Sequence, residues 1–63
     1  MRKESRYFQF IHFVGETLDR NPFEVNKAFG RAVEQQTVTM GQIARWVEEP
    51  ELDKIREIVT SFK

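Results

Sequence analysis

The chain has 63 residues, of which 40% are hydrophobic and 32% charged, and its ten basic residues balance ten acidic ones. This composition is typical of a folded domain, and the zero net charge excludes the basic excess that marks many nucleic-acid-binding domains. The absence of cysteine excludes disulfides and thiolate metal sites. It also favours a cytoplasmic setting, because small extracellular domains usually carry disulfides. We therefore expect residues 1–63 to form one helical domain of marginal stability.

The first predicted element is an amphipathic helix over residues 5–19. At about 100° per residue, its apolar face collects Tyr7, Phe10, Ile11, Val14 and Leu18. Phe8 and Phe13 fall on opposite flanks, which makes the apolar arc wider than one partner helix can cover. We therefore expect this helix to lie at the centre of a small bundle. Gln9 and His12 interrupt the apolar run, so we predict no membrane span. A membrane-surface role for this helix is an alternative.

A second helix is predicted over residues 22–36. Asn21 is a favourable N-cap, and Pro22 fits the first helical position because its missing N–H would be unpaired there anyway. The buried stripe of this helix is expected to comprise Val25, Ala28, Phe29, Ala32 and Val33.

Two shorter helices complete the chain. Thr39 and Gln42 match a capping box, which predicts a third helix over residues 40–49. The buried residues of this helix are expected to be Met40, Ile43, Trp46 and Val47. Pro50 cannot continue a helix without losing a hydrogen bond, so a fourth helix is expected over residues 51–62. Its apolar stripe comprises Leu52, Ile55, Ile58, Val59 and Phe62. The predicted fold class is therefore all-α, a compact bundle of four short helices around the N-terminal one.

The sequence lacks the combination of side chains that catalysis needs. His12 is the only histidine and hence the only base expected to titrate near neutral pH, and Ser5 is the one serine near it on the same helix side. A nucleophile also needs a third group to orient its base. Glu16, one turn after His12, could share a metal ion with it, but zinc needs three or four ligands. We therefore expect no enzymatic activity, no cofactor, no metal ion and no small-molecule substrate.

The segment 32–47, AVEQQTVTMGQIARWV, resembles the helix-turn-helix of small bacterial and phage repressors. The resemblance implies that Ile43 and Trp46 pack inward from a recognition helix. The residues that would face the DNA groove are Thr39, Gln42 and Arg45. In that arrangement Gln42 pairs with adenine and Arg45 with guanine or phosphate. The alternative function is therefore a DNA-binding transcriptional regulator, acting as a dimer.

Two features of this segment differ from the repressor pattern. The pattern has an apolar residue near Gln36 and a glycine near Thr37, and this chain has neither. Four acidic residues between Glu48 and Asp53 would repel phosphates if they lay near the groove. We therefore place DNA binding second.

Three aromatic residues, Phe8, Phe13 and Phe23, lie off the main stripe of their helices. Any one of them is more simply a core residue, but an exposed aromatic is how small domains present a binding hot spot. Phe23, with Gly30 two turns later on the same side, is the first choice for such a spot. The predicted protein-binding site comprises Phe23, Lys27, Gly30, Arg31 and Glu34. The leading hypothesis is a non-enzymatic regulatory or adaptor module that binds another protein or a second copy of itself, as a homodimer.

Charge is placed unevenly along the chain. Arg2, Lys3 and Arg6 make the beginning basic, whereas the segment Glu48–Asp53 is acidic. These groups can pair within one molecule, pair across a dimer or steer a charged partner. The sequence leaves these three alternatives open.

Overall fold

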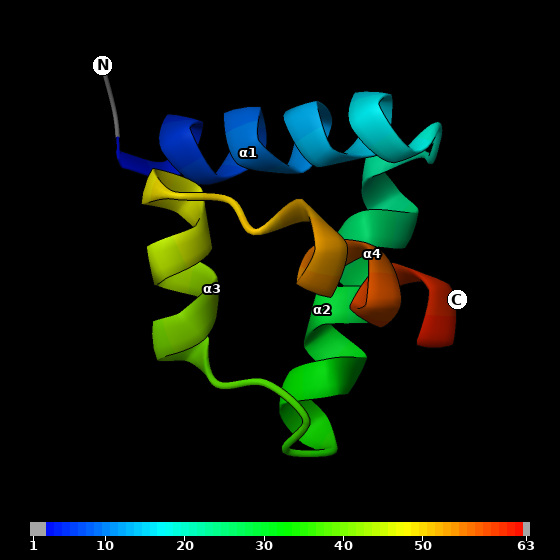
Figure 1. Cartoon of the computed structure of the whole chain (residues 1–63). Coiled ribbons are helices and arrows are strands. Elements are labelled where there is room, and N and C mark those ends of the chain that lie inside the picture. Colours follow the sequence, from blue (N-terminus) through cyan, green and yellow to red (C-terminus); the bar gives the residue numbers. More distant parts are fainter. Residues whose placement is uncertain (1–2, 63) are drawn as a thin grey trace.

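The computed structural model describes residues 3–62 of the chain, with side chains from Arg6 onward. This part of the chain forms four α-helices and no strand: α1 (Lys3–Leu18), α2 (Pro22–Glu34), α3 (Met40–Glu48) and α4 (Leu52–Ser61). The all-α bundle expected from the sequence is therefore confirmed (Figure 1). Among the described residues, no helix is both long and apolar enough to cross a membrane.

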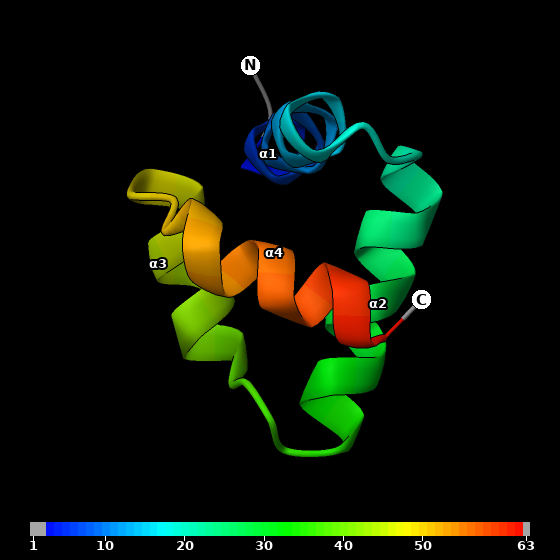
Figure 2. The same ribbon diagram turned by 45° about the vertical axis from the view of Figure 1, so that its right-hand side comes forward.

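The helix α1 lies across the ends of α2 and α3, and α4 crosses between those two helices (Figure 1). The view turned by 45° looks nearly along α1 and shows the other three helices on one side of it (Figure 2). The helix α1 packs against each of the other three helices, and α2 packs as extensively against α4 as against α1. The other helices thus cover α1 from one side, and α2 shares the centre of the fold with it.

The core is built from one apolar stripe of each helix, together with one residue of a connection. Its buried side chains are Phe10, Ile11, Val14, Val25, Ala28, Phe29, Ala32, Val38, Ile43, Trp46, Ile55, Ile58 and Val59. Three aromatic rings form its centre: Phe10 stacks on Phe29 with ring centroids 5.9 Å apart, and Phe29 meets Trp46 at 6.3 Å. Because these rings come from α1, α2 and α3, one aromatic column joins three of the four helices.

Side-chain caps fix where α2 and α3 begin. The Asn21 carboxamide accepts a hydrogen bond from the Phe23 N–H at 2.8 Å, and Glu24 accepts one from the Asn21 N–H at 3.4 Å. At the start of α3, the Thr39 hydroxyl accepts a hydrogen bond from the Gln42 N–H at 3.1 Å, and the Gln42 carboxamide accepts one from the Thr39 N–H at 3.0 Å. Both capping boxes satisfy backbone N–H groups that the first helical turn leaves unpaired. The predicted caps at Asn21 and Thr39 are therefore confirmed.

The same kind of chain reversal ends α1 and α2. Asp19 and Gln36 have positive φ angles of 58° and 61°. The Arg20 N–H donates to the Gly15 carbonyl at 2.7 Å, and the Thr37 N–H donates to the Ala32 carbonyl at 2.8 Å. These bonds define Schellman turns. They stop α2 at Glu34, two residues before the predicted end, since Gln36 leaves the helical conformation.

The prediction that Met40 is buried is wrong, and the connection before α3 contributes a core residue that the sequence did not indicate. Met40 was expected in the core but is 67% exposed, whereas Val38 is buried although it lies in the connection. The reason is the capping geometry, because Thr39 holds an extended conformation that turns the chain into α3. Val38, ahead of the cap, enters the core, and Met40 begins the helix at its surface.

The aromatic residues off the main stripes are not core residues. Phe8 is 62% exposed, Phe13 45% and Phe23 83%, so the simpler expectation of burial is wrong for all three. Phe8 and Phe13 remain exposed because the helices packed on α1 cover only the middle of its apolar arc. Phe23 lies on α2 opposite the buried stripe, and no other helix covers that side.

The glycines at positions 15 and 30 have different surroundings. A Cβ atom on Gly15 would lie 2.6 Å from the carbonyl oxygen of Arg20, because the chain reversal after α1 folds back against it. The chain's own turn therefore occupies the space beside Gly15. A Cβ atom on Gly30 would meet nothing within 4 Å.

Alanine substitutions should therefore have opposite effects at these two positions. We expect Gly30→Ala to raise the free energy of unfolding by about 0.5–1 kcal/mol, because alanine loses less backbone entropy in a helix. We expect Gly15→Ala to lower it by more than about 1 kcal/mol, because the turn backbone must move. Urea denaturation followed by circular dichroism measures both, and a stable Gly15→Ala variant would contradict the close approach of Arg20.

Candidate functional site

The outer face of α2 carries the residues predicted to bind another protein. Each of these residues is exposed on the side of the helix opposite its buried stripe: Phe23, Lys27, Gly30, Arg31 and Glu34. The Asn21 cap fixes the backbone of Phe23, and the empty space beside Gly30 lets a partner approach the helix closely. The structure thus places the five predicted residues on one helix face.

The exposed aromatic surface continues from α2 onto α1, which the sequence did not reveal. The ring of Phe8 lies 6.4 Å from that of Tyr7, and the Tyr7 hydroxyl donates a hydrogen bond to Oδ1 of Asn26 at 2.7 Å. Asn26 is three residues after Phe23, so the two are neighbours on the surface of α2. We call the surface made by Tyr7, Phe8, Phe23 and Asn26 the aromatic face.

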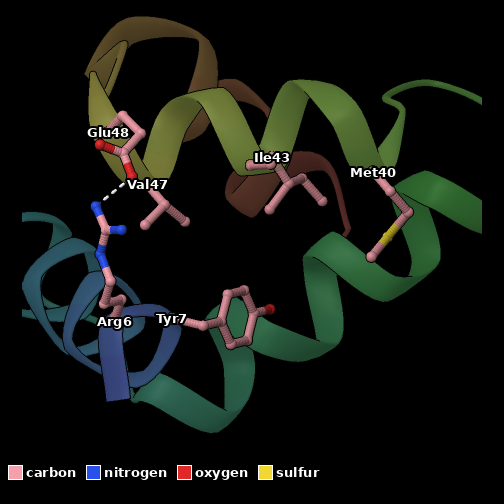
Figure 3. A pocket seen from close by; sticks show the side chains of 7 residues that line it. Arg6, Tyr7, Met40, Ile43, Val47 and Glu48 are labelled. Atoms are coloured by element: carbon pink, nitrogen blue, oxygen red, sulfur yellow. Dashed lines mark hydrogen bonds and ion pairs between the residues drawn. The ribbon is translucent and has the colours of Figure 1, made fainter. Parts of the chain in front are cut away.

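A cleft lies beside the aromatic face, between α1 and α3. It has a volume of about 360 Å³ and is lined by Arg6, Tyr7, Met40, Ile43, Ala44, Val47 and Glu48. Figure 3 shows Tyr7 and Ile43 extending toward each other from α1 and α3, with Met40 at one end. We call this hollow the α1–α3 cleft. Sequence periodicity placed Met40 in the core and so gave no sign of the cleft.

An ion pair between Arg6 and Glu48 closes the other end of the cleft (Figure 3). The sequence left three arrangements open for these charges. Arg6 forms the first of them, an ion pair within one molecule. Both side chains are more than half exposed, so the pair contributes less than about 1 kcal/mol to stability. Arg2 and the side chain of Lys3 lie outside the described part of the structure.

The three residues that the repressor resemblance assigns to DNA are all exposed on one side of α3 and its cap. Gln42 and Thr39 are engaged with each other in the capping box, so Gln42 would have to break a hydrogen bond to reach a base. Arg45 lines a polar hollow with Glu49 and Glu51. Lys54, which pairs with Glu51, lines the same hollow, so two basic and two acidic side chains meet there.

The helix pair around this segment also differs from a helix-turn-helix. The connection between α2 and α3 spans residues 35–39, whereas the DNA-binding motif uses a turn of about three or four residues and crosses its helices at roughly 90–120°. Both views show α2 and α3 running in opposite directions (Figures 1 and 2). DNA binding would have to use a different docking geometry.

The remaining chemistry-bearing side chains are dispersed. His12 and Glu16 line an open recess of about 510 Å³ at the turn between α1 and α2. No group of three or more metal-binding side chains comes together within residues 6–62. Asp19, Arg20 and Asn21 line the same recess.

The pKa of Tyr7, a residue of the aromatic face, makes the free energy of unfolding depend on pH under alkaline conditions. Burial between α1 and α2 raises the pKa of Tyr7 above its ordinary value of 10.0, so on alkaline titration the unfolded chain loses this proton first. The stabilisation that follows from burying the neutral Tyr7 hydroxyl is therefore complete below about pH 10. It is lost as the pH rises through the raised pKa of Tyr7. We expect Tyr7→Phe to lower the free energy of unfolding by about 0.5–1.5 kcal/mol at neutral pH, because the bond to Asn26 is lost.

We also expect the variant to lose less stability than the wild type between about pH 8 and pH 11. Thermal denaturation of both proteins at each pH measures this difference, and lysine titration is common to the two chains. An equal loss in both would show that Tyr7 ionises alike in the folded and unfolded states.

Comparison with known proteins adds no name to this surface. No family model, curated protein or solved structure matches the chain.

Proposed function

We propose that this protein is a small non-enzymatic binding module that acts by docking another protein chain on its aromatic face and on the outer face of α2. The observation that carries the proposal is the exposure of Phe23, a large aromatic side chain that no other element of the fold covers. A chain of this size buries only about 60% of its unfolded surface. Leaving three phenylalanines outside the core is therefore costly for stability, and binding a partner accounts for their retention.

The chemistry around Phe23 fits a protein partner. Interfaces have an aromatic centre with a polar rim, and arginine is enriched in them. Here Phe23 is followed along the outer face of α2 by Lys27, Arg31 and Glu34, which present both signs of charge. A surface of mixed charge recognises another folded protein better than it recognises a polyanion. A regulatory or adaptor role, in the cytoplasm, follows as part of this proposal.

Replacing Phe23 separates binding from folding. We expect Phe23→Ser to keep the helical circular dichroism signal and to reduce partner capture at least about tenfold, a typical hot-spot effect. The measurement is a pull-down from the native host with quantitative mass spectrometry of the captured proteins. Phe13→Ser is the matched control, because Phe13 lies on the other flank of α1.

Three outcomes would contradict this assignment. Unfolding of Phe23→Ser would show that Phe23 supports the fold after all. Equal capture by wild type and Phe23→Ser would move the binding surface elsewhere. Loss of binding in Phe13→Ser alone would place it on the opposite flank of α1.

DNA binding through α3 is the second candidate, favoured by the exposure of Thr39, Gln42 and Arg45 on one side of that helix. On the protein-binding proposal we expect no binding to a mixed-sequence duplex at about 50 mM salt, where non-specific phosphate attraction would already be visible. A fluorescence titration measures this. Binding that Arg45→Ala removes would replace the protein-binding proposal with the DNA-binding one.

A further inference from the structure

Four residues form a single row along the outer face of α2: Phe23, Lys27, Gly30 and Glu34. We call them the α2 row. We propose that the protein forms a symmetric homodimer in which the α2 rows of two copies pack against each other, antiparallel, with Gly30 at the crossing point. This inference rests on the protein-binding function proposed above and names the partner as a second copy of this chain. The position of the row, its glycine and the placement of its charges support it.

The α2 row points directly away from the core. At about 3.6 residues per turn, its four members fall within an arc of about 60° on the helix. The centre of this arc lies about 180° from the centre of the buried stripe of α2. All four members are exposed, Phe23 by 83%. The row is therefore open to a second helix laid along it.

Gly30 lies near the middle of the exposed part of α2. A Cβ atom there would meet nothing within 4 Å, and no glycine of the described chain has a positive φ angle. Neither packing within the molecule nor backbone conformation therefore requires glycine at this position. Glycine in a helix interior lowers stability relative to alanine, and it allows another backbone to approach closely. A second helix that crosses at Gly30 accounts for its presence.

The charges of the α2 row are complementary to themselves under a twofold axis. Lys27 lies three residues before Gly30, and Glu34 lies four residues after it. Both are thus about 5 Å along the helix from a point beside Gly30. An axis through that point brings Lys27 of each copy opposite Glu34 of the other, because a twofold contact is reciprocal. A parallel arrangement would instead set Lys27 beside Lys27.

These charges have no ion pair of their own inside one molecule. Within residues 6–62 the ion pairs are Arg6 with Glu48 and Lys54 with Glu51, so Lys27 and Glu34 take part in neither. Opposite charges that meet across an interface fix its register and orientation. The second copy is therefore the partner whose charge pattern the α2 row matches by construction.

The dimer is expected to be weak. Two helices of 13 residues bury less area than a standard interface, so we expect a dissociation constant of roughly 10–100 μM. Arg31 lies about 70° to one side of the row. Its two copies come near the axis at the rim, where solvent and salt weaken their repulsion.

A substitution that fills the crossing point tests the contact without disturbing the fold. We expect sedimentation equilibrium to show a dimer for the wild type and at least a tenfold higher dissociation constant for Gly30→Gln. Glutamine favours the helix and has open space at this position. Gly41→Gln is the matched control, because a Cβ atom on Gly41 makes an ordinary contact and Gly41 lies on α3. This control should dimerise like the wild type, and circular dichroism checks that both variants keep their helices.

A charge swap tests the reciprocal pairs. We expect Lys27→Glu and Glu34→Lys each to raise the dissociation constant at least tenfold, because each variant sets like charges opposite each other at two places. Mixing the two variants should restore dimerisation, since both facing pairs then carry opposite charges. The double variant in one chain should also dimerise like the wild type.

Arg56→Glu and Glu57→Lys are the matched controls for the charge swap. They make the same changes of net charge on the exposed side of α4. Each control should dimerise like the wild type. Controls that dissociate as much as the α2 variants would overturn the proposal, because net charge and not the facing pairs would then govern association.

The remaining outcomes separate this inference from the function it rests on. A wild-type chain that stays monomeric up to about 1 mM, a concentration at which only very weak association is missed, would overturn the dimer. It would leave the binding of a different protein at Phe23 to the pull-down above. A dimer that persists unchanged in Gly30→Gln, or a mixture of Lys27→Glu and Glu34→Lys that stays monomeric, would also overturn the proposed contact.

Discussion

The contact between Phe10, Phe29 and Trp46 holds this small fold together. It joins α1, α2 and α3 through ring contacts at 5.9 and 6.3 Å, and α4 covers it with Ile55, Ile58 and Val59. This chain of 63 residues has no cysteine, so no disulfide supplements the core. Its stability must come mainly from packing these few large side chains.

Because so few large side chains form the core, the phenylalanines that lie outside it need an explanation. Burying a phenylalanine side chain contributes about 1.5–3 kcal/mol, which is a large share of the stability of a domain this small. Phe8 and Phe23 are exposed and do not make this contribution. Both lie close to the hydrogen bond from Tyr7 to Asn26, which links α1 to α2. The exposure of Phe23, which no other helix covers, is the basis of the binding function proposed for this protein.

The backbone turns decide where the exposed surface lies. The chain reversal after α1 packs against Gly15 and leads directly into the Asn21 cap. The cap sets the first turn of α2 and thereby the direction of Phe23, whose N–H it binds. The second reversal, at Gln36, shortens α2 and leads through Val38 and Thr39 into α3. Each wall of the α1–α3 cleft is therefore positioned by a turn that precedes it or follows it.

The sequence by itself determined the number and type of helices, their caps at Asn21 and Thr39 and most of the buried stripes. These features depend on local periodicity and on side chains that bind the backbone of near neighbours. It could also place Phe23, Lys27, Gly30, Arg31 and Glu34 on one face, because that follows from helical spacing alone. Only the tertiary structure decided that Phe8 and Met40 are exposed, that Val38 is buried and that a cleft lies between α1 and α3. Those outcomes depend on which part of an apolar arc the neighbouring helices cover, and helix crossings are set by contacts between residues far apart in the chain.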